Sequence, residues 1–399
     1  MPPSQTSTQR TDTAQTSTKP ARRRGLLFRL AAVLLGFLVV LVVVEVGLRL
    51  SGYAPVSLRN IWRLNPLDET RQQRGDYYSL YEENPHGDFE PLPELDGDRW
   101  ELLGGDGAPR PLERIDERPW CVEYRHSSLG LRERELDGYW PPPGTTRIAC
   151  VGDSFAYGQG VPAAKTLPRT LEAELGNGAE VVSISRVGWD LSEETKQLAR
   201  FRQEHHCGKA IFVFVLNDLL LTKELALRNE AIFQRMHDRE ESLERFRSGL
   251  WQLGPSRLCQ LISASLADHR VSQETLAWYR DCFDPAKNDV GLDLLEQQLA
   301  ELASLKDCRV AIVIFPIMRQ LDDDYPFLAA HERVAEMATA AGLPVLDLLP
   351  EFRGQDARSL WVNAVDNHPN SRGHAIAAKA IARWLREALP EFLEPDERH

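Results

Sequence analysis

The sequence predicts an α/β fold built on a parallel sheet, because short apolar runs alternate with segments of helical periodicity. The runs are rich in β-branched residues, which is typical of strands buried on both faces of a parallel sheet. They occupy residues 146–151, 181–187, 211–216, 310–315 and 345–348. Between them, leucines recur at helical spacing, and a last amphipathic helix is expected to begin at Pro369 and to end near Leu389.

Glycine and polar residues follow three of these strands directly. Gly152-Asp153-Ser154 ends the first strand, Gly188 ends the second, and Asn217 ends the third. The carboxyl ends of parallel strands meet at one edge of the sheet, where open α/β folds build their sites. Asp366 and His368 stand just before the last helix. We therefore expect these residues to come together in one site.

The residue types in this set are those that nucleophilic attack on an ester requires. Such a reaction needs a nucleophile, a base, a group that orients the base, and donors for the oxyanion. We expect Ser154 to be the nucleophile, His368 the general base that later acts as acid, and Asp366 the orienting carboxylate. The backbone N–H groups of Ser154 and Gly188 and the side-chain amide of Asn217 are the expected oxyanion donors. A Gly-Asp-Ser turn alone is most often only a turn, so the prediction depends on all the pieces in this order.

The segment GDSFAYGQGV and the three later pieces resemble the SGNH/GDSL hydrolase family, which is named for its serine, glycine, asparagine and histidine blocks. The resemblance covers residues 145–390, and the matching residues are Ser154, Gly188, Asn217 and His368. It implies a three-layer α/β/α fold with a flavodoxin-like parallel sheet. It also implies esterase, lipase or carbohydrate-deacetylase chemistry that uses neither a metal nor a cofactor.

The chain departs from the family's pattern at two positions. Val215 stands where the third block usually has glycine, and Val365 stands where the last block usually has the acid, three residues before His368. The nearest acid is Asp366, two residues before His368. A residue that precedes proline is extended, and positions i and i+2 of extended chain point to the same side. Asp366 is therefore the expected triad acid, while Asp347 or a backbone carbonyl is the alternative.

The N-terminal region predicts a membrane anchor. Residues 1–29 carry a formal charge of about +5 and are expected to form a disordered cytoplasmic tail. Residues 30–50 are expected to be a transmembrane helix, since about 19 mostly apolar residues span roughly 28 Å. A cleaved signal peptide is the alternative, but the apolar run is long for one and no A-x-A-like site follows it. The arginine cluster at 22–24 predicts a cytoplasmic N-terminus and a body in the periplasm or outside the cell.

The remaining chain is acidic, so electrostatic binding of nucleic acid is excluded as a function class. Residues 51–144 are expected to be a linker and a small β or irregular lead-in. Residues 145–390 are expected to form the hydrolase domain, with a helical insertion at 222–306 that overhangs the site. In this insertion Trp278, Tyr279 and Phe283 either line a substrate pocket or belong to the core.

The six cysteines show no metal-binding spacing. Because the body is expected outside the cytoplasm, disulfides are possible, and we expect Cys207 to lie close to Cys308 and Cys259 close to Cys282. His205 and His206 precede a strand on the side away from the expected site, so a metal role is not expected there.

Taken together, the sequence predicts a single-pass, membrane-anchored serine esterase. Its expected substrate is an ester, such as an O-acetyl group on an envelope glycan, a lipid, or a small-molecule ester. One alternative is an O-acyltransferase of envelope polysaccharide, in which a sugar hydroxyl replaces water. The other is a non-catalytic envelope protein that retains the fold.

Overall fold

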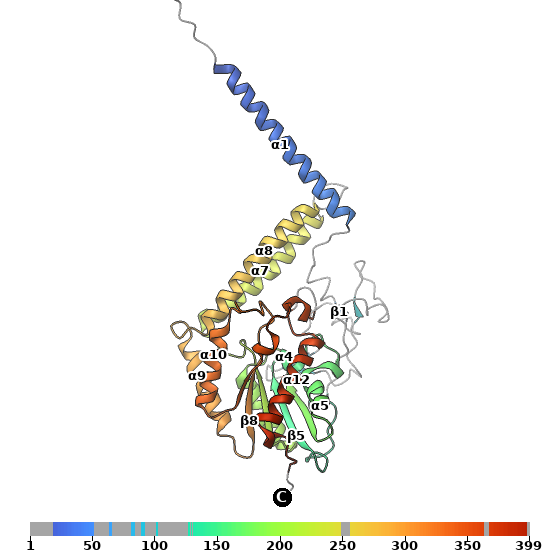
Figure 1. The fold of residues 1–399 in the computed structure, drawn as a ribbon, viewed down its shortest axis with the longest axis vertical. Helices are drawn as coiled ribbons and strands as arrows, with labels where there is room; N and C mark the ends of the chain where they lie inside the picture. Colours follow the sequence, from blue (N-terminus) through green and yellow to red (C-terminus); the bar gives the residue numbers. More distant parts are fainter. Residues whose placement is uncertain are drawn as a thin grey trace, which may run out of the picture. The chain divides into compact units, whose positions relative to one another are not determined.

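The computed structural model describes residues 19–51, 64–65, 81–83, 89–91, 101–102, 127, 129, 131–248, 256–362 and 367–396. The chain divides into two compact units. One combines residues 1–55 with 242–265, and the other combines residues 56–241 with 266–399. The second unit holds the sheet and all of the expected site residues (Figure 1).

The sheet of the second unit has five parallel strands in the order β6-β5-β7-β8-β9. In chain order the strands are β5 (Thr146–Gly152), β6 (Ala179–Ser185), β7 (Lys209–Phe214), β8 (Arg309–Ile314) and β9 (Val345–Asp347). Every residue of β5 is buried, as its apolar, β-branched sequence predicts for a strand near the centre of a sheet. The strand order is flavodoxin-like, and it confirms the predicted fold class.

Helices flank this sheet in two groups (Figure 1). In the first group, α5 (Leu167–Leu175) packs against α12 (Ser371–Ala388). In the second, α9 (Asp289–Ala303) contacts both α6 (Leu191–Glu204) and α10 (Leu328–Ala340). Short helical segments complete the strand connections: α4 (Ser154–Tyr157), η3 (Ala163–Lys165), α11 (Leu349–Phe352), η4 (Ala357–Leu360) and η5 (Pro390–Phe392).

The last helix begins later than the sequence predicts. Pro369 is not its first residue, because the backbone of Pro369 forms an isolated β-bridge with Trp361. Asn370 is the N-cap instead, and its side-chain oxygen accepts hydrogen bonds from the backbone N–H groups of Arg372 and Gly373. An asparagine N-cap satisfies N–H groups that the first helical turn leaves unpaired.

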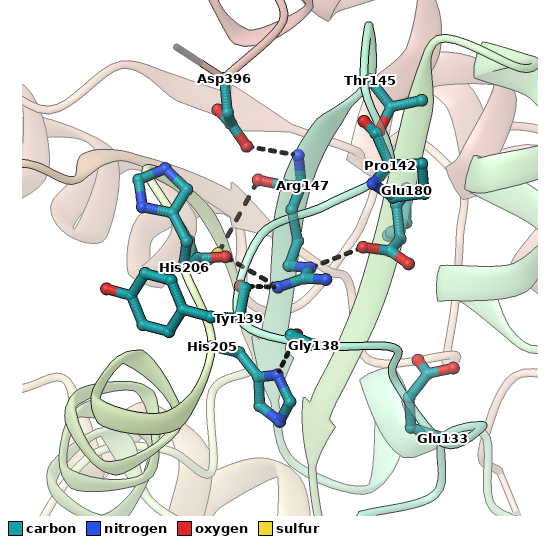
Figure 2. A network of polar contacts seen from close by, with 12 residues as sticks. Glu133, Gly138, Tyr139, Pro142, Thr145, Arg147, Glu180, His205, His206 and Asp396 are labelled. Atoms are coloured by element: carbon teal, nitrogen blue, oxygen red, sulfur yellow. Dashed lines mark hydrogen bonds and ion pairs between the residues drawn. The ribbon is translucent and has the colours of Figure 1, made fainter. Parts of the chain in front are cut away.

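A buried polar network closes the amino edge of the sheet, at the end of the strands away from Ser154 (Figure 2). Arg147 of β5 forms an ion pair with Glu180 of β6 at 2.6 Å and donates to the backbone oxygens of Tyr139 and His206. Its own backbone N–H donates to the carboxylate of Asp396. The network therefore ties residues 139–147 and the C-terminal segment to the sheet and leaves the carboxyl edge for the site.

The first unit contains α1 (Lys19–Leu50), which begins inside the segment 1–29 that the sequence predicts to be disordered. Its residues Phe28–Leu50 have a mean hydropathy of 2.8 and are long and apolar enough to cross a bilayer. Near the end of α1, the carboxylate of Glu45 accepts hydrogen bonds from the backbone N–H groups of Arg257 and Leu258 at 3.0 and 2.8 Å. It also accepts one from the Ser256 hydroxyl. Glu45 thus caps the first turn of α8 (Arg257–Cys282).

In the few described residues of the region expected as a β or irregular lead-in, the chain forms short strands, of which Figure 1 labels β1. β1 (Leu64–Asn65) pairs antiparallel with β4 (Glu101–Leu102), and β2 (Tyr81–Glu83) pairs antiparallel with β3 (Phe89–Pro91). The domain boundaries expected at 51–144 and 145–390 remain predictions.

The region 222–306 is helical, with α7 (Lys223–Ser248) and α8 followed by α9. Of the three aromatic residues considered for a substrate pocket, two belong to the core. Trp278 and Phe283 are buried, and the indole N–H of Trp278 donates to the Leu225 carbonyl. Tyr279 is half-buried and packs edge-on against Trp278 and Phe327.

The expected cysteine pairs are not bonded, since all five described cysteines are free thiols. Arg309 pairs with Lys209 in the sheet, so Cys207 lies one position out of register with Cys308, and its Sγ lies against the carbonyls of Arg147 and Lys209. Cys259 and Cys282 stand near opposite ends of α8, roughly 35 Å apart at 1.5 Å per residue. A disulfide needs Cα atoms within about 7 Å, so the second pairing is wrong.

Candidate active site

Ser154 stands on the turn that leaves β5. Gly152 ends the strand, and a Cβ there would lie 2.8 Å from the Cβ of Ala156 and 3.1 Å from the carbonyl oxygen of Val213. Only glycine permits this close packing of β5 against α4 and β7. Asp153 follows and caps α4 by accepting a hydrogen bond from the N–H of Phe155 at 2.8 Å. The turn thereby fixes Ser154 at the carboxyl edge of the sheet.

His368 lies next to Ser154 although the two residues are far apart in the sequence. The Nε2 atom of His368 is 2.8 Å from the Oγ of Ser154, within hydrogen-bond distance. In this pair the hydroxyl donates the hydrogen bond when Nε2 of the imidazole carries no proton. This is the geometry that a serine nucleophile needs with its general base.

The segment around His368 is held by backbone pairing with the end of η4. The N–H of Val362 donates to the carbonyl of His368 at 2.9 Å, and the Asn370 side chain donates to the Trp361 carbonyl at 3.1 Å. The His368 ring also packs against the ring of Phe155, the residue after the serine, with a centroid distance of 5.3 Å. These contacts position the imidazole from three sides.

Asp153 has a role in the site that the sequence analysis did not assign. Its carboxylate accepts hydrogen bonds from the Asn217 side-chain amide at 2.7 Å and from the Ser154 hydroxyl at 3.2 Å. Burial raises the pKa of Asp153, and the hydrogen bonds from Asn217 and Phe155 oppose that shift. The sequence could have predicted this role, because Asp153 directly precedes the serine. An acid at the N-cap of the serine's helix faces the same site.

Gly188 and Asn217 follow β6 and β7, the strands on either side of β5. Gly188 has φ +80°, in the left-handed region that favours glycine, and it is exposed. Asn217 is exposed as well, and one of its amide hydrogens is donated to Asp153. The structure therefore brings Ser154, His368 and Asn217 together, and it places Gly188 at the same edge of the sheet.

The expected triad acid, Asp366, lies outside the described residues, so its role stays a prediction. The alternative acid, Asp347, is engaged elsewhere. Its carboxylate oxygen lies 2.9 Å from the Nδ1 atom of His331 and accepts a hydrogen bond from the Leu349 N–H. The Nε2 of His331 in turn contacts the Tyr325 hydroxyl at 3.2 Å.

Two further carboxyl groups are buried beside Asp153. Glu194 of α6 and Asp218, the residue after Asn217, are almost completely excluded from solvent. Burial raises the pKa of both groups, and repulsion from neighbouring carboxylates, Asp153 among them, raises each further. Among the described residues, neither oxygen of Glu194 has a hydrogen-bond partner. Burial among carboxylates therefore favours the neutral form of both acids.

Serine, glycine, asparagine and histidine stand at the positions that the family blocks require, on a sheet of the expected strand order. This arrangement agrees with the resemblance to the SGNH/GDSL hydrolases that the sequence shows. No family model and no curated protein sequence matches the chain.

Several solved structures are similar to this SGNH-like chain. One is an inhibitor-bound aryl esterase from M. smegmatis, at 12% identity and a TM-score of 0.31, covering 61% of this chain and 99% of its own. Another is a member of the lipolytic protein G-D-S-L family from Veillonella parvula DSM 2008, at 13% identity and a TM-score of 0.31. The match covers 61% of this chain and 100% of that one. A third is a carbohydrate acetylesterase from Sinorhizobium meliloti, at 10% identity and a TM-score of 0.30. The match covers 61% of this chain and 99% of that one.

The described residues contain no group of three or more His, Cys, Asp or Glu side chains that could hold a metal ion. His205 and His206 have other contacts. The Nδ1 of His205 lies 3.0 Å from the Gly138 carbonyl oxygen, and the His206 ring stacks on Trp140 with a centroid distance of 4.0 Å.

Proposed function

We propose that the protein is a serine ester hydrolase of SGNH type with Ser154 as nucleophile. The observation that carries the proposal is the 2.8 Å contact between the Ser154 hydroxyl and the Nε2 of His368. A serine hydroxyl is a weak nucleophile by itself, and a base within hydrogen-bond distance activates it.

The proposed reaction proceeds by acyl transfer through Ser154. The serine oxygen attacks the ester carbonyl carbon while its proton passes to Nε2 of His368, which gives a tetrahedral intermediate. The C–O bond to the alcohol then breaks, and His368 returns the proton to the leaving oxygen. Water then attacks the acyl-enzyme: its proton goes to His368 and its oxygen bonds to the acyl carbon. The bond from that carbon to the Ser154 oxygen breaks, His368 returns the proton to Ser154, and the acid leaves. Asp366 is proposed to hold the Nδ1 proton of His368.

Three donors are proposed for the oxyanion: the backbone N–H groups of Ser154 and Gly188 and the second amide N–H of Asn217. The hydrogen bond from Asn217 to Asp153 supports this role, because it uses one amide hydrogen and fixes the side chain so that the other has a defined direction. Preorganised donors of this kind stabilise the developing charge at no cost in reorganisation.

Membrane attachment through α1, with the N-terminus in the cytoplasm, is part of the proposal. The length and hydropathy of Phe28–Leu50 support a span. The capping of α8 by Glu45 supports retention of this helix in the mature protein, because cleavage after it would remove the cap. The arginines that precede the span support a body in the periplasm or outside the cell.

The proposed substrates are esters, with O-acetyl groups on an envelope glycan first among them. The similar structures include an aryl esterase and a carbohydrate acetylesterase, and this range is consistent with an ester substrate. If a sugar hydroxyl in place of water resolves the acyl-enzyme, the same site performs O-acyl transfer.

The direct test is hydrolysis of acetylated sugars and short-chain aryl esters by the full-length protein and its Ser154→Ala variant. We expect hydrolysis by the wild type and a loss of 10³-fold or more in the variant, about the scale for loss of a serine nucleophile. Ser304→Ala is the matched control, because Ser304 ends α9 and its hydroxyl only donates to Glu301. Hydrolysis that survives in Ser154→Ala would refute the assignment.

The proposed orientation has its own test. Protease added outside spheroplasts is expected to digest the chain after about residue 55, since the acidic body is expected to lie beyond the cytoplasmic membrane. Lysed spheroplasts serve as the control for protease access. A body protected in intact spheroplasts and digested after lysis would reverse the orientation.

A further inference from the structure

Two arginines flank Trp361 at the edge of the candidate site, and neither has an acidic partner in the described part of the chain. The guanidinium carbon of Arg319 lies 6.0 Å from the centre of a Trp361 ring, and that of Arg358 lies 5.7 Å from it. Among the described residues, no carboxylate lies within ion-pair distance of either guanidinium. Arg319 is half-buried and donates only to the Ser272 hydroxyl, at 3.0 Å.

An unpaired guanidinium in such a position is energetically costly. Burial lowers the pKa of Arg319, and the nearby cation Arg358 lowers it further. Charged side chains removed from water are normally paired or hydrogen-bonded to an acid. The remainder of this chain after residue 29 is strongly acidic, so a cationic pair without acids is not explained by composition.

Both arginines belong to segments that form the catalytic edge. Arg319 follows β8 within the segment that begins at Phe315, whose ring packs against Phe155, the residue after the nucleophile. Trp361 pairs with Pro369, the residue after His368, and its indole N–H donates to the Met318 carbonyl at 2.6 Å. The tryptophan thus connects the Arg319 segment to the histidine segment.

The sheet gives the spacing between the strands that precede the nucleophile and Arg319. Ser154 follows β5 and Arg319 follows β8, and β7 lies between these two strands. Two steps of about 4.8 Å between strands correspond to about 10 Å across the edge. A group held by Arg319 would therefore lie well beyond a bound acetyl group, elsewhere on the substrate.

We propose that Arg319 and Arg358 form a subsite for an anionic group of the ester substrate, a carboxylate or a phosphate about 10 Å from the scissile carbonyl. The guanidinium donors match planar oxyanions, and Trp361 holds the two cations by cation–π contact. The subsite assigns the substrate class of the proposed esterase and rests on that function. Anionic esters are then preferred over neutral esters of the same size.

The test compares matched neutral and anionic esters with the full-length enzyme. On the acyl side the pair is p-nitrophenyl octanoate and mono-p-nitrophenyl suberate, whose chains have the same length. On the alcohol side, mono-O-acetyl cellobiose is compared with mono-O-acetyl digalacturonate and with mono-O-acetyl cellobiose 6′-phosphate. The last two distinguish a carboxylate from a phosphate as the preferred group.

We expect Arg319→Met to lower kcat/KM about tenfold or more for the anionic member of at least one pair and less than twofold for its neutral partner. Arg319→Lys is expected to retain part of the preference, because the charge remains while the planar donor pair is lost. Arg358→Met, at an exposed position, is expected to act in the same direction with a smaller effect. The matched control is Arg383→Met, since Arg383 is exposed and paired with Glu351 on α12 and α11.

The outcomes separate the subsite from the esterase function. Equal losses for neutral and anionic esters in both arginine variants would overturn the subsite and leave the esterase standing. If the wild type hydrolyses no ester, the proposed function fails. In that case, ligand-observed NMR with digalacturonate and cellobiose decides the subsite alone. Digalacturonate binding that is lost in Arg358→Met supports the subsite, and equal binding of both sugars overturns it.

Discussion

At the scale of single residues, the proposed function depends on the hydrogen bonds among four side chains, those of Ser154, His368, Asp153 and Asn217. The Ser154 hydroxyl lies between Nε2 of His368 at 2.8 Å and the Asp153 carboxylate at 3.2 Å, and the same carboxylate fixes Asn217. The hydroxyl has one proton, and the shorter of the two contacts is the one to the base. Asp153 is thereby a positioning residue for both the nucleophile and the expected oxyanion donor.

The triad acid is the residue-scale prediction. Asp366→Asn is expected to lower kcat by up to about 10⁴-fold with little change in KM, because the carboxamide no longer stabilises the protonated imidazole. The measurement is steady-state hydrolysis of an aryl ester. Asp356→Asn is the control, since Asp356 lies nearby but caps η4 through the Arg358 N–H. An unchanged rate in Asp366→Asn would show that another group orients His368.

At the scale of elements, the strands and the position of the nucleophile follow from local sequence. Apolar β-branched runs identify the five strands within a few residues, because strands buried on both faces have no polar alternation. The convergence of Ser154 with Asn217 was predictable, since parallel strands end at a common edge. The place of His368 followed from the resemblance to the hydrolase family, because no strand directly precedes it. The arginine pair at Trp361 was not predictable, because Arg319 and the segment of Arg358 and Trp361 are distant in sequence and no motif marks them.

The errors also have physical causes at this scale. The start of α12 was misplaced because an asparagine N-cap at Asn370 is stronger than the preference of proline for the first helical turn. Cys207 and Cys308 stand just before neighbouring strands, as expected, but they are one position out of register and both are free thiols.

The contact between α1 and α8 leads to an element-scale prediction. Replacing Glu45 with alanine leaves the N–H groups of Arg257 and Leu258 without their acceptor. Loss of an N-cap costs about 1 kcal/mol, so these amides should exchange hydrogen about fivefold faster in detergent micelles. Glu230→Ala, at an exposed position on α7, is the control. Unchanged exchange at both amides would contradict a capping role for Glu45.

At the scale of the whole molecule, buried acids beside the site lower stability as the pH rises. The pKa of Glu194 is raised by burial and by Asp153, so the folded protein holds this proton above pH 4.5 while the unfolded chain releases it. Stability that is present below pH 4.5 is therefore lost as the pH rises toward the folded pKa. The buried acid at the functional edge of the sheet thus lowers the free energy of unfolding as the pH rises.

Glu194→Gln is expected to remove this cost. The variant should match the wild type in Tm near pH 4.5 and exceed it increasingly toward pH 8. The expected gain is about 2–4 °C for each kcal/mol recovered. The measurement is thermal unfolding of the full-length protein in detergent at several pH values. Glu193→Gln is the control, because Glu193 is paired with Lys196 on the outer face of the same helix. A pH-independent difference would mean that Glu194 does not titrate between the two states.

The central claim is that Ser154 forms a covalent bond during the reaction. Its most direct test is labelling with a fluorophosphonate, followed by mass spectrometry of the intact protein and of its proteolytic peptides. The account predicts one adduct, on the peptide that contains Ser154, and no adduct in Ser154→Ala. It also predicts labelling slowed by His368→Gln, which removes the base 2.8 Å from the hydroxyl. An adduct on another serine, or equal labelling of Ser154→Ala, would contradict it.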